Sequence, residues 1–180
     1  MSTATTTLTY VIDPAHTTVA FVIRHMMIAR VRGHFNGVSG AIELSAGSKL
    51  PSRVDATIET ASIDTREAQR DAHLKSPDFF DAATSPHITF HSTRIEGDGV
   101  SFRVFGDLTI RGTTREVSLK ATFEGAGTDP WGNERIGFEA HATINRRDFG
   151  LGWNQALETG GVLVGDEVRI ELSVEAIAQS

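Results

Sequence analysis

The stretch that decides the fold is Glu167-Val168-Arg169-Ile170-Glu171-Leu172-Ser173-Val174-Glu175, near the end of this 180-residue chain. Its apolar residues Val168, Ile170, Leu172 and Val174 alternate strictly with polar ones. Because successive side chains point to opposite sides of a strand, this pattern predicts a β-strand with one dry face and one wet face.

Similar alternation recurs along the chain and predicts strands at 8–12, 17–24, 30–44, 53–60, 87–96, 100–111, 116–124, 135–146 and 167–178. The links between most of these segments are short, which favours antiparallel pairing because parallel strands need long crossovers. About eight such segments in one short chain predict an all-β fold, an extended antiparallel eight-stranded barrel. A closed sheet of this size has room inside for a small apolar ligand.

One helical insert, over residues 65–81, interrupts the strands. Asp64 is expected to cap it, with Glu67 at the third helical position as in a capping box. A second short helix is expected to begin at Ser76, with Pro77 at its first position. The chain length fits a single domain over residues 1–180, in which the Thr-rich residues 1–7 form a flexible N-terminus.

Composition excludes several classes of function. With 39% hydrophobic and 22% charged residues, the chain is typical of a soluble globular protein. A net charge of −6 weighs against nucleic acid as a partner and against binding anionic membranes by overall charge. The absence of cysteine excludes disulfides and thiol chemistry. The first residues lack a secretory pattern, and the longest apolar run, 19–23, is too short to span a membrane, so we expect a cytoplasmic location.

No catalytic or metal-binding constellation emerges from the motifs. The chain has seven histidines, of which His87 and His91 share a strand face. Four residues of strand separate that pair by about 13 Å, too far for one metal ion to bridge. Nucleophile-elbow, phosphate-loop and dinucleotide motifs are absent. We therefore predict no catalytic residues, no metal site and no cofactor.

Basic residues next to apolar stretches are more informative. Arg24 and His25 follow an apolar strand and precede two methionines, and Arg146 follows the strand at 135–146. Polar groups at the mouth of an apolar cavity orient a long ligand by its head group. The alternative, which the sequence leaves open, is that these arginines pair with surface acids such as Asp71 or Asp148.

The segment 100–111 carries bulky residues on both of its faces. Phe102 and Val104 share one face with Leu108 and Ile110, whereas Phe105 lies on the other. A second chain, the helical insert or a β-bulge would each account for this. A homodimer is one economical explanation.

Several short sequence blocks follow one another along the chain, from about Tyr10 to Ala176. The opening blocks are Ile12-Asp13-x-x-His16-Thr17 and Phe21-Val22-Ile23-Arg24-His25-Met26. The middle and late blocks are Ser62-Ile63-Asp64-Thr65, Ser76-x-Asp78-Phe79-Phe80-Asp81 and Arg147-Asp148-Phe149-Gly150-Leu151. Each block is weak by itself, but together and in this order they specifically resemble the YceI family.

The resemblance implies a lipocalin-like barrel that binds long isoprenoid lipids, often as a homodimer. It implies non-enzymatic binding, storage or transport of a polyisoprenoid lipid, either an isoprenoid quinone or a prenyl phosphate. The expected pocket residues are Phe21, Ile23, His25, Phe35, Leu74, Phe79, Phe90, Phe102 and Trp153, and Arg24, His25 or Arg146 would meet the head group.

Two other functions remain open at this stage. One is an enzyme that uses the cavity residue His25 as an acid or base on a hydrophobic ligand. The other is a stress-related interaction module, whose ten phenylalanines fill the barrel instead of lining a void. The sequence pattern does not separate a filled barrel from a hollow one.

Overall fold

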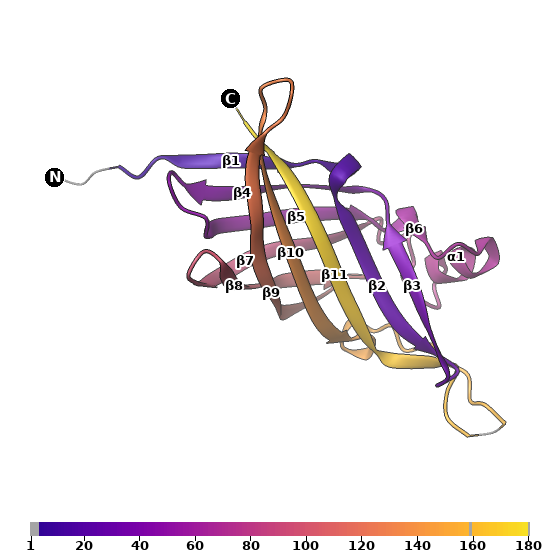
Figure 1. Cartoon of the computed structure of the whole chain (residues 1–180). Coiled ribbons are helices and arrows are strands. Elements are labelled where there is room, and N and C mark those ends of the chain that lie inside the picture. The colour runs from indigo at the N-terminus through magenta and orange to yellow at the C-terminus, as the bar shows by residue number, and fades with distance from the viewer. Residues whose placement is uncertain (1–3, 159, 180) are drawn as a thin grey trace.

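A computed structural model describes residues 4–158 and 160–179, and within them the strands form one antiparallel sheet (Figure 1). The strands are β1 (Thr7–Ile12), β2 (Thr18–His25), β3 (Ala29–Phe35), β4 (Val38–Ser45), β5 (Pro51–Glu59), β6 (Ile63–Asp64), β7 (His87–Gly97), β8 (Ser101–Ile110), β9 (Thr113–Thr128), β10 (Glu134–Asn145) and β11 (Val164–Ala178). The helix α1 spans Ala68–Lys75, and three short 3-10 helices span Pro14–His16, Thr60–Ser62 and Arg146–Phe149.

The sheet closes into a barrel because β1 pairs with β4 on one side and with β11 on the other. The closed ring runs β1-β4-β5-β7-β8-β9-β10-β11, so the predicted eight-stranded antiparallel barrel is confirmed. The first part of β11 pairs instead with β2. The sheet then continues through the pairing of β2 with β3 and of β3 with β6. These three strands extend the wall beyond the ring.

The extension arises because three neighbouring strands bend. A 3-10 turn over Pro14–His16 separates β1 from β2, and a second over Thr60–Ser62 separates β5 from β6. Between them, the predicted single strand 30–44 is split into β3 and β4 at Asn36-Gly37. Gly37 lies directly against Glu59, where an added Cβ would come within 2.5 Å of its carboxylate. The close approach explains why glycine stands at this bend.

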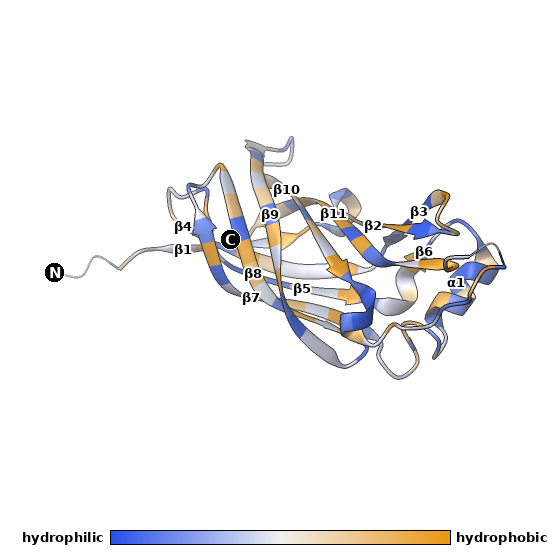
Figure 2. Ribbon diagram, turned by 90° about the horizontal axis from the view of Figure 1, so that it is seen from below, coloured by the Kyte–Doolittle hydropathy of each residue, from blue (hydrophilic) through white to orange (hydrophobic). Residues whose placement is uncertain are grey.

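Alternation along the strands sorts apolar side chains to the inside. In the β2–β3 pair, Val19 lies opposite Phe35, Phe21 opposite Gly33 and Ile23 opposite Val31. Figure 2 shows the same alternation as orange and blue bands along β11. The four apolar residues that predict this last strand, Val168, Ile170, Leu172 and Val174, all face the interior cavity.

The two ends of the barrel differ in packing. At one end Phe138 packs edge-on against Phe102 and Phe123, with ring centroids 5.9 Å and 5.5 Å apart. This end lies near the β7–β8 turn, where Gly97 pairs with Phe102. The other end, beside α1, encloses a cavity. The barrel is therefore filled at one end and hollow at the other, a combination that the sequence did not indicate.

The helical insert is shorter than predicted, and it is capped differently. Glu67, not Asp64, is the N-cap of α1, and its carboxylate accepts hydrogen bonds from the N–H groups of Gln69 and Arg70. Arg66 has a left-handed backbone with φ of 68°, which prevents the helix from starting earlier. Asp64 instead accepts a hydrogen bond from the Arg66 N–H.

The expected second helix at Ser76 is a series of turns. Ser76 ends α1 as its C-cap, and its N–H and hydroxyl both donate to the carbonyl of His73, at 3.1 Å and 2.6 Å. The N–H groups of Phe79 and Asp81 both donate to the Ser76 carbonyl. Asp81 also has a positive φ of 49°, so no helical run follows Pro77.

Phe105 is covered by a side chain of the neighbouring strand. The guanidinium of Arg94 stacks over the Phe105 ring at 4.0 Å, in the range of a cation–π interaction. A register shift between Ser92 and Arg94, where β7 pairs with β8, accompanies this contact. The bulky outer face of β8 is thus explained within one chain, and the homodimer stays a prediction.

The ends of the chain add little to the wall. The segment 1–7, predicted to be flexible, lies partly outside the described residues, and Thr7 already pairs with Ser45. No helix in the described part of the chain has the length and apolar character needed to cross a membrane. The single-domain organisation stays a prediction, which the continuous sheet supports.

Candidate functional site

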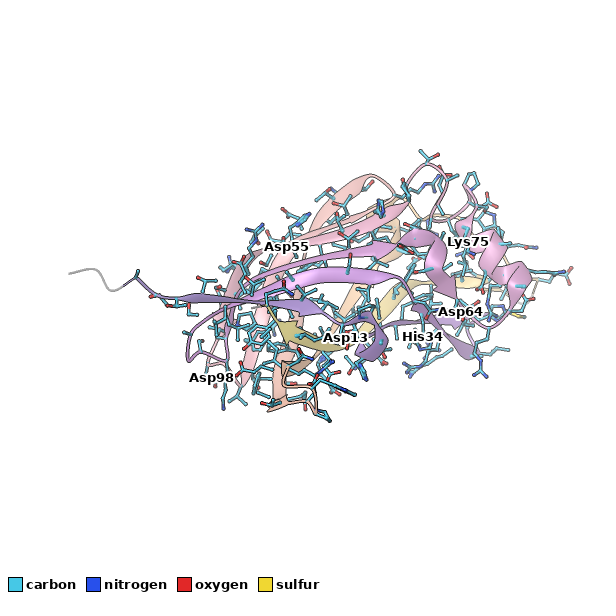
Figure 3. The ribbon with its side chains drawn as sticks, turned by 90° about the horizontal axis from the view of Figure 1, so that it is seen from above. Asp13, His34, Asp55, Asp64, Lys75 and Asp98 are labelled. Carbon is cyan, nitrogen blue, oxygen red and sulfur yellow. The ribbon has the colours of Figure 1, made fainter. Side chains whose placement is uncertain are left out.

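A cavity of about 590 Å³ occupies the end of the barrel next to the insert. In Figure 3 Lys75 marks this end of the molecule and Asp98 marks the opposite, filled end. The wall is formed mainly by inward-facing apolar side chains of the strands and the insert. Its polar and charged members are Thr17, Arg24, His25, Thr65, Gln69, Arg70, His73 and Arg146. A cavity with this lining suits a long apolar ligand with a small polar end.

The structure brings ten of the eleven predicted ligand-binding residues to the wall of this cavity. They are Phe21, Ile23, Arg24, His25, Phe35, Leu74, Phe79, Phe90, Arg146 and Trp153. Phe102 is the exception, because it is 5% exposed and packs against Phe138 in the filled end of the barrel. Both ends of the interior show the same apolar alternation in sequence, so the pattern does not tell Phe102 from the others.

Two glycines set the positions of wall phenylalanines. A Cβ at Gly33 would lie 2.3 Å from Cζ of Phe21, the residue opposite it across the β2–β3 pair. A Cβ at Gly106 would lie 2.4 Å from Cζ of Phe90. The outer edge of each ring therefore lies over a glycine, which keeps the ring against the wall and leaves the space in front of it open.

The insert closes the cavity on one side with aromatic contacts. His73 of α1 packs edge-on against Trp153 and Phe79, with ring centroids 4.6 Å and 5.1 Å apart. Phe79 and Trp153 also contact each other, at 5.3 Å. These rings join the insert to the segment that follows β10. The insert therefore acts as a lid whose position depends on contacts between residues far apart in sequence.

Arg146 has a structural role at the wall. Its guanidinium is 2% exposed and donates hydrogen bonds to four backbone carbonyls, those of Leu151, Trp153, Val164 and Gly165. Burial lowers the pKa of Arg146, and the Asp166 carboxylate 3.7 Å away opposes this shift. Most donors of Arg146 are therefore taken up by backbone carbonyls, and its carboxylate neighbour among the described residues is Asp166 and not Asp71 or Asp148. A contact of Arg146 with a head group stays a prediction.

Arg24 and His25 lie at the mouth of the cavity. Arg24 is exposed, and its Nη1 is 3.5 Å from the carbonyl of Met27, at the limit of a hydrogen bond. Within the described residues, neither Arg24 nor His25 has a carboxylate partner. Both side chains are thus available to a ligand entering from outside.

Arg70 is a cavity residue that the sequence analysis did not single out. Its Nε donates to Thr65 Oγ1 at 2.8 Å, and its Nη2 donates to the Thr65 carbonyl at 2.6 Å. Asp71 accepts hydrogen bonds from the N–H and the hydroxyl of Thr65. Within the described residues Nη1 of Arg70 has no hydrogen-bond partner, and the residue lies in the cavity wall. Only the folded insert reveals this, since nothing in the local sequence distinguishes Arg70 from a surface arginine.

His73 also escaped prediction as a site residue. Its Nε2 lies 2.8 Å from Oδ2 of Asp78, which makes it a cavity histidine with a carboxylate partner. His73 and Asp78 are five residues apart, a spacing that does not by itself predict a contact. The pair forms because the chain turns at the end of α1. The alternative enzyme hypothesis had named His25, which lacks such a partner within the described part of the chain.

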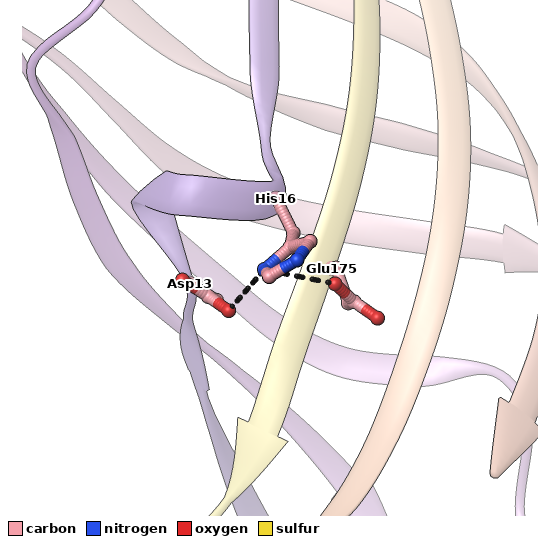
Figure 4. A group of neighbouring side chains, drawn as sticks. All are labelled: Asp13, His16 and Glu175. Carbon is pink, nitrogen blue, oxygen red and sulfur yellow. Dashed lines mark hydrogen bonds and ion pairs between the residues drawn. The ribbon is translucent and has the colours of Figure 1, made fainter. Parts of the chain in front are cut away.

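Among the described residues, one cluster has the residue types of a metal site, and an arginine already forms ion pairs with its carboxylates. Asp13, His16 and Glu175 lie together beside the bend between β1 and β2 (Figure 4). Asp13 Oδ2 lies 2.8 Å from His16 Nδ1 and accepts a hydrogen bond from Arg135 Nη1 at 2.7 Å. The same Nη1 is 3.6 Å from Glu175. The group is therefore an ion-pair network that holds the bend.

The pKa values of the network follow from these contacts. Hydrogen bonds from Arg135 and then from His16 hold the pKa of Asp13 below its usual range. Arg135 Nε also donates to Asp129 at 2.8 Å, which together with N–H groups of the β9–β10 turn lowers the pKa of Asp129 strongly. These acids stay charged at neutral pH and fix Arg135 in place.

A second hollow, of about 920 Å³, lies on the outer side of the sheet. Arg103, Lys120, His141 and Glu171 line it, and they are neighbours in register across β8 to β11. Phe102, Ala121, Ala140 and Leu172, which alternate with these residues along the strands, also border it. The charged lining makes this open surface unsuitable for an apolar ligand, so the interior cavity is the candidate site.

Solved structures share this fold. The chain aligns with Burkholderia cenocepacia BcnA at a TM-score of 0.78 and 27% identity, covering 92% of this chain and 99% of that one. A Campylobacter jejuni YCEI protein aligns at 0.76 and 31% identity, covering 87% and 90%. A polyisoprenoid binding domain from Saccharophagus degradans aligns at 0.69 over 94% and 98%, and at 15% identity this likeness shows the fold alone.

Sequence relatives agree with the structural ones. A UPF0312 protein of Pseudomonas paraeruginosa is 38% identical over 164 residues, 91% of this chain and 83% of the relative. A UPF0312 protein of Staphylococcus aureus is 38% identical over 167 residues, 92% and 95% of the two chains. The model of the YceI-like domain matches residues 10–176, nearly the same span as the resemblance in the sequence. The chain therefore belongs to the YceI-like domain family.

Proposed function

We propose that this protein binds a long polyisoprenoid lipid in the interior cavity and stores or transports it without changing it chemically. The observation that carries the proposal is the enclosed cavity of about 590 Å³ with its largely apolar wall. An isoprenoid chain has almost no polar handle, so its affinity must come from buried apolar area. The Saccharophagus domain of the same fold, which is described as a polyisoprenoid binding domain, supports this class of ligand.

The polar residues of the cavity suggest how the lipid is oriented. Arg70 has an unoccupied guanidinium nitrogen within the described structure, and it lies in the wall formed by the insert. Arg24 and His25 stand at the mouth. A quinone or phosphate head group accepts hydrogen bonds and would be held by such donors. The apolar chain would then lie along the phenylalanines of the strands.

A binding role is favoured over catalysis by the chemistry of the lining. A general base needs a partner that sets its orientation, and His25 has none within the described residues. His73 has such a partner in Asp78, and it also packs between the rings of Phe79 and Trp153. That packing supports a role for His73 in closing the lid.

The test is to identify the lipid that the protein carries. Purified protein is extracted with organic solvent, before and after incubation with cell lipids, and the extract is analysed by mass spectrometry. Wild type is expected to yield about one polyisoprenoid per chain, of the same mass as the lipid supplied. An empty extract in both cases would overturn the proposal, and a lipid of altered mass would favour an enzyme.

A variant that fills the cavity sharpens the test. Ala56 lies in the wall on β5, and Ala56→Phe should occupy the space in front of Phe90, which is opposite it in register. Ala126→Phe is the matched control, because Ala126 is exposed on β9 and lies outside the cavity wall. We expect Ala56→Phe to lose the lipid and the control to retain it. Equal lipid content in both variants would contradict the cavity as the binding site.

A further inference from the structure

The turn between β2 and β3 exposes three consecutive apolar side chains. Met26, Met27 and Ile28 are 39%, 52% and 81% exposed. Exposed apolar groups that are contiguous, unlike scattered ones, mark contact surfaces on soluble proteins. The three side chains form a projecting tip, which we call the hairpin tip.

The backbone of the hairpin tip is unusual for these residues. Met26 and Met27 have φ angles of 52° and 63°, in the left-handed region that residues other than glycine, asparagine and aspartate rarely adopt. The Ile28 N–H donates to the His25 carbonyl at 3.2 Å and closes the turn. Turns with two such residues strongly prefer Asn-Gly. Methionines here sacrifice turn stability, and such strain is concentrated at functional sites.

The strands that flank the hairpin tip carry unpaired positive charge. Arg24 lies directly opposite Arg30 in register, an arrangement in which like charges repel. In the part of the chain that the structure describes, neither arginine forms an ion pair with a carboxylate. Residues 14–42 contain no Asp or Glu at all. The hairpin is therefore a basic segment with an apolar end.

The hairpin tip lies beside the mouth of the cavity. The Met26 N–H donates to the Leu163 carbonyl at 2.8 Å, and the Met27 side chain packs against Gly161. Figure 1 shows the end of the β2–β3 hairpin next to the loop that precedes β11. Arg24, His25 and Leu163 also line the cavity, so the hairpin tip and the mouth form one continuous surface.

We propose that the β2–β3 hairpin docks the protein on an anionic phospholipid bilayer. The hairpin tip enters the region between head groups and acyl chains, while Arg24 and Arg30 contact lipid phosphates. The overall charge of −6 does not prevent this, because charges more than about 8 Å away are largely screened at physiological salt. Docking in this way turns the cavity mouth toward the membrane. The inference goes beyond cargo binding and does not depend on which lipid fills the cavity.

The experiment is sedimentation with vesicles of phosphatidylcholine, with and without phosphatidylglycerol. Wild type is expected to bind the mixed vesicles, and to bind them more weakly as salt is raised. The key variant combines Met26→Asn with Met27→Gly, which removes the apolar side chains and supplies the residues that the turn prefers. We expect this variant to be at least as stable as wild type in urea and to lose vesicle binding at least fivefold. A purely structural turn would show the gain in stability without the loss of binding.

Two further variants test the charge and the location. Replacing Arg24 and Arg30 with Gln should weaken binding to anionic vesicles by roughly fivefold per arginine. Trp131→Asp is the control, because Trp131 is 82% exposed in the β9–β10 turn at the other end of the barrel. It should bind vesicles as wild type does.

The outcomes separate docking from cargo binding. Ala56→Phe should bind vesicles as wild type does even where its lipid content is lost, so failure of the proposed cargo would leave docking intact. Wild-type binding by the Asn-Gly variant, or an equal loss in Trp131→Asp, would overturn the inference. Binding of the hairpin to an acidic polypeptide but to neither kind of vesicle would also overturn it, in favour of a protein partner.

Discussion

Arg146 shows how one buried residue can hold together the loop beside the cavity. Its guanidinium satisfies carbonyls on both sides of the loop between β10 and β11. Replacing it with Ala leaves those buried carbonyls unpaired, and we expect the free energy of unfolding to fall by about 3 kcal/mol. Urea denaturation measures this loss.

Arg147 provides the control for that substitution. It is half exposed and pairs with Asp166 at 2.8 Å, so Arg147→Ala should change the free energy of unfolding by less than about 1 kcal/mol. Equal effects of the two substitutions would show that the carbonyl contacts of Arg146 do not stabilise the loop.

The network around Arg135 predicts how stability depends on pH. The folded-state pKa values of Asp13 and Asp129 are lowered, first of all by hydrogen bonds from Arg135. Their contribution to stability is therefore complete above the unfolded pKa of about 3.9, and is lost as pH falls below that value toward the folded pKa values. We expect Arg135→Gln to destabilise the protein at pH 6, and the difference from wild type to shrink below about pH 4. Urea denaturation across this range tests it, and a difference independent of pH would contradict the network.

At the scale of strands, the pairing of glycine with phenylalanine shapes the cavity. An added Cβ at Gly33 displaces the Phe21 ring, whose free edge can turn into the cavity. We expect Gly33→Ala to weaken lipid binding about tenfold, which corresponds to about 1.4 kcal/mol, with a smaller effect on unfolding. Binding titration and urea denaturation together measure the two effects.

Gly127→Ala in β9 is the matched substitution for Gly33→Ala. Nothing lies within 4 Å of its added Cβ, and Gly127 is exposed outside the cavity. It should leave lipid binding unchanged. If both variants bind equally well, the contact between Phe21 and Gly33 does not define the cavity.

At the scale of the whole molecule, a ligand inside the barrel must stabilise the fold. A ligand that binds only the folded state at 100 times its Kd adds about 2.7 kcal/mol. For a chain of this size that corresponds to a rise in Tm of roughly 5–10 °C. Protein stripped of lipid should show the lower Tm in a thermal scan, and the same protein reloaded with lipid should show the higher Tm. Ala56→Phe should show no rise with added lipid, and an unchanged Tm for wild type would argue against an enclosed ligand.

The sequence determined the architecture because alternation is a local property of each strand. The pattern at Val168–Val174 fixes which face of that strand is apolar, and short links fix antiparallel neighbours. The ordered blocks indicated the YceI family, and the family match over residues 10–176 confirms that assignment. Five of the expected pocket residues, Phe21, Ile23, His25, Phe35 and Phe90, reach the cavity for the same reason, since they alternate inward along their strands.

Only the tertiary structure decided which end of the barrel is filled, which end is hollow, and which polar groups line the cavity. Phe102 and Phe90 are alike in sequence, yet one is packed into the filled end and the other faces the cavity. Arg146 is committed to four carbonyls, whereas Arg70, also in the cavity wall, keeps one nitrogen without a partner in the part of the chain that the structure describes. These roles depend on contacts between segments far apart in the chain. Periodicity predicts on which face of a strand a side chain lies. It does not predict which side chains from other segments pack against that face.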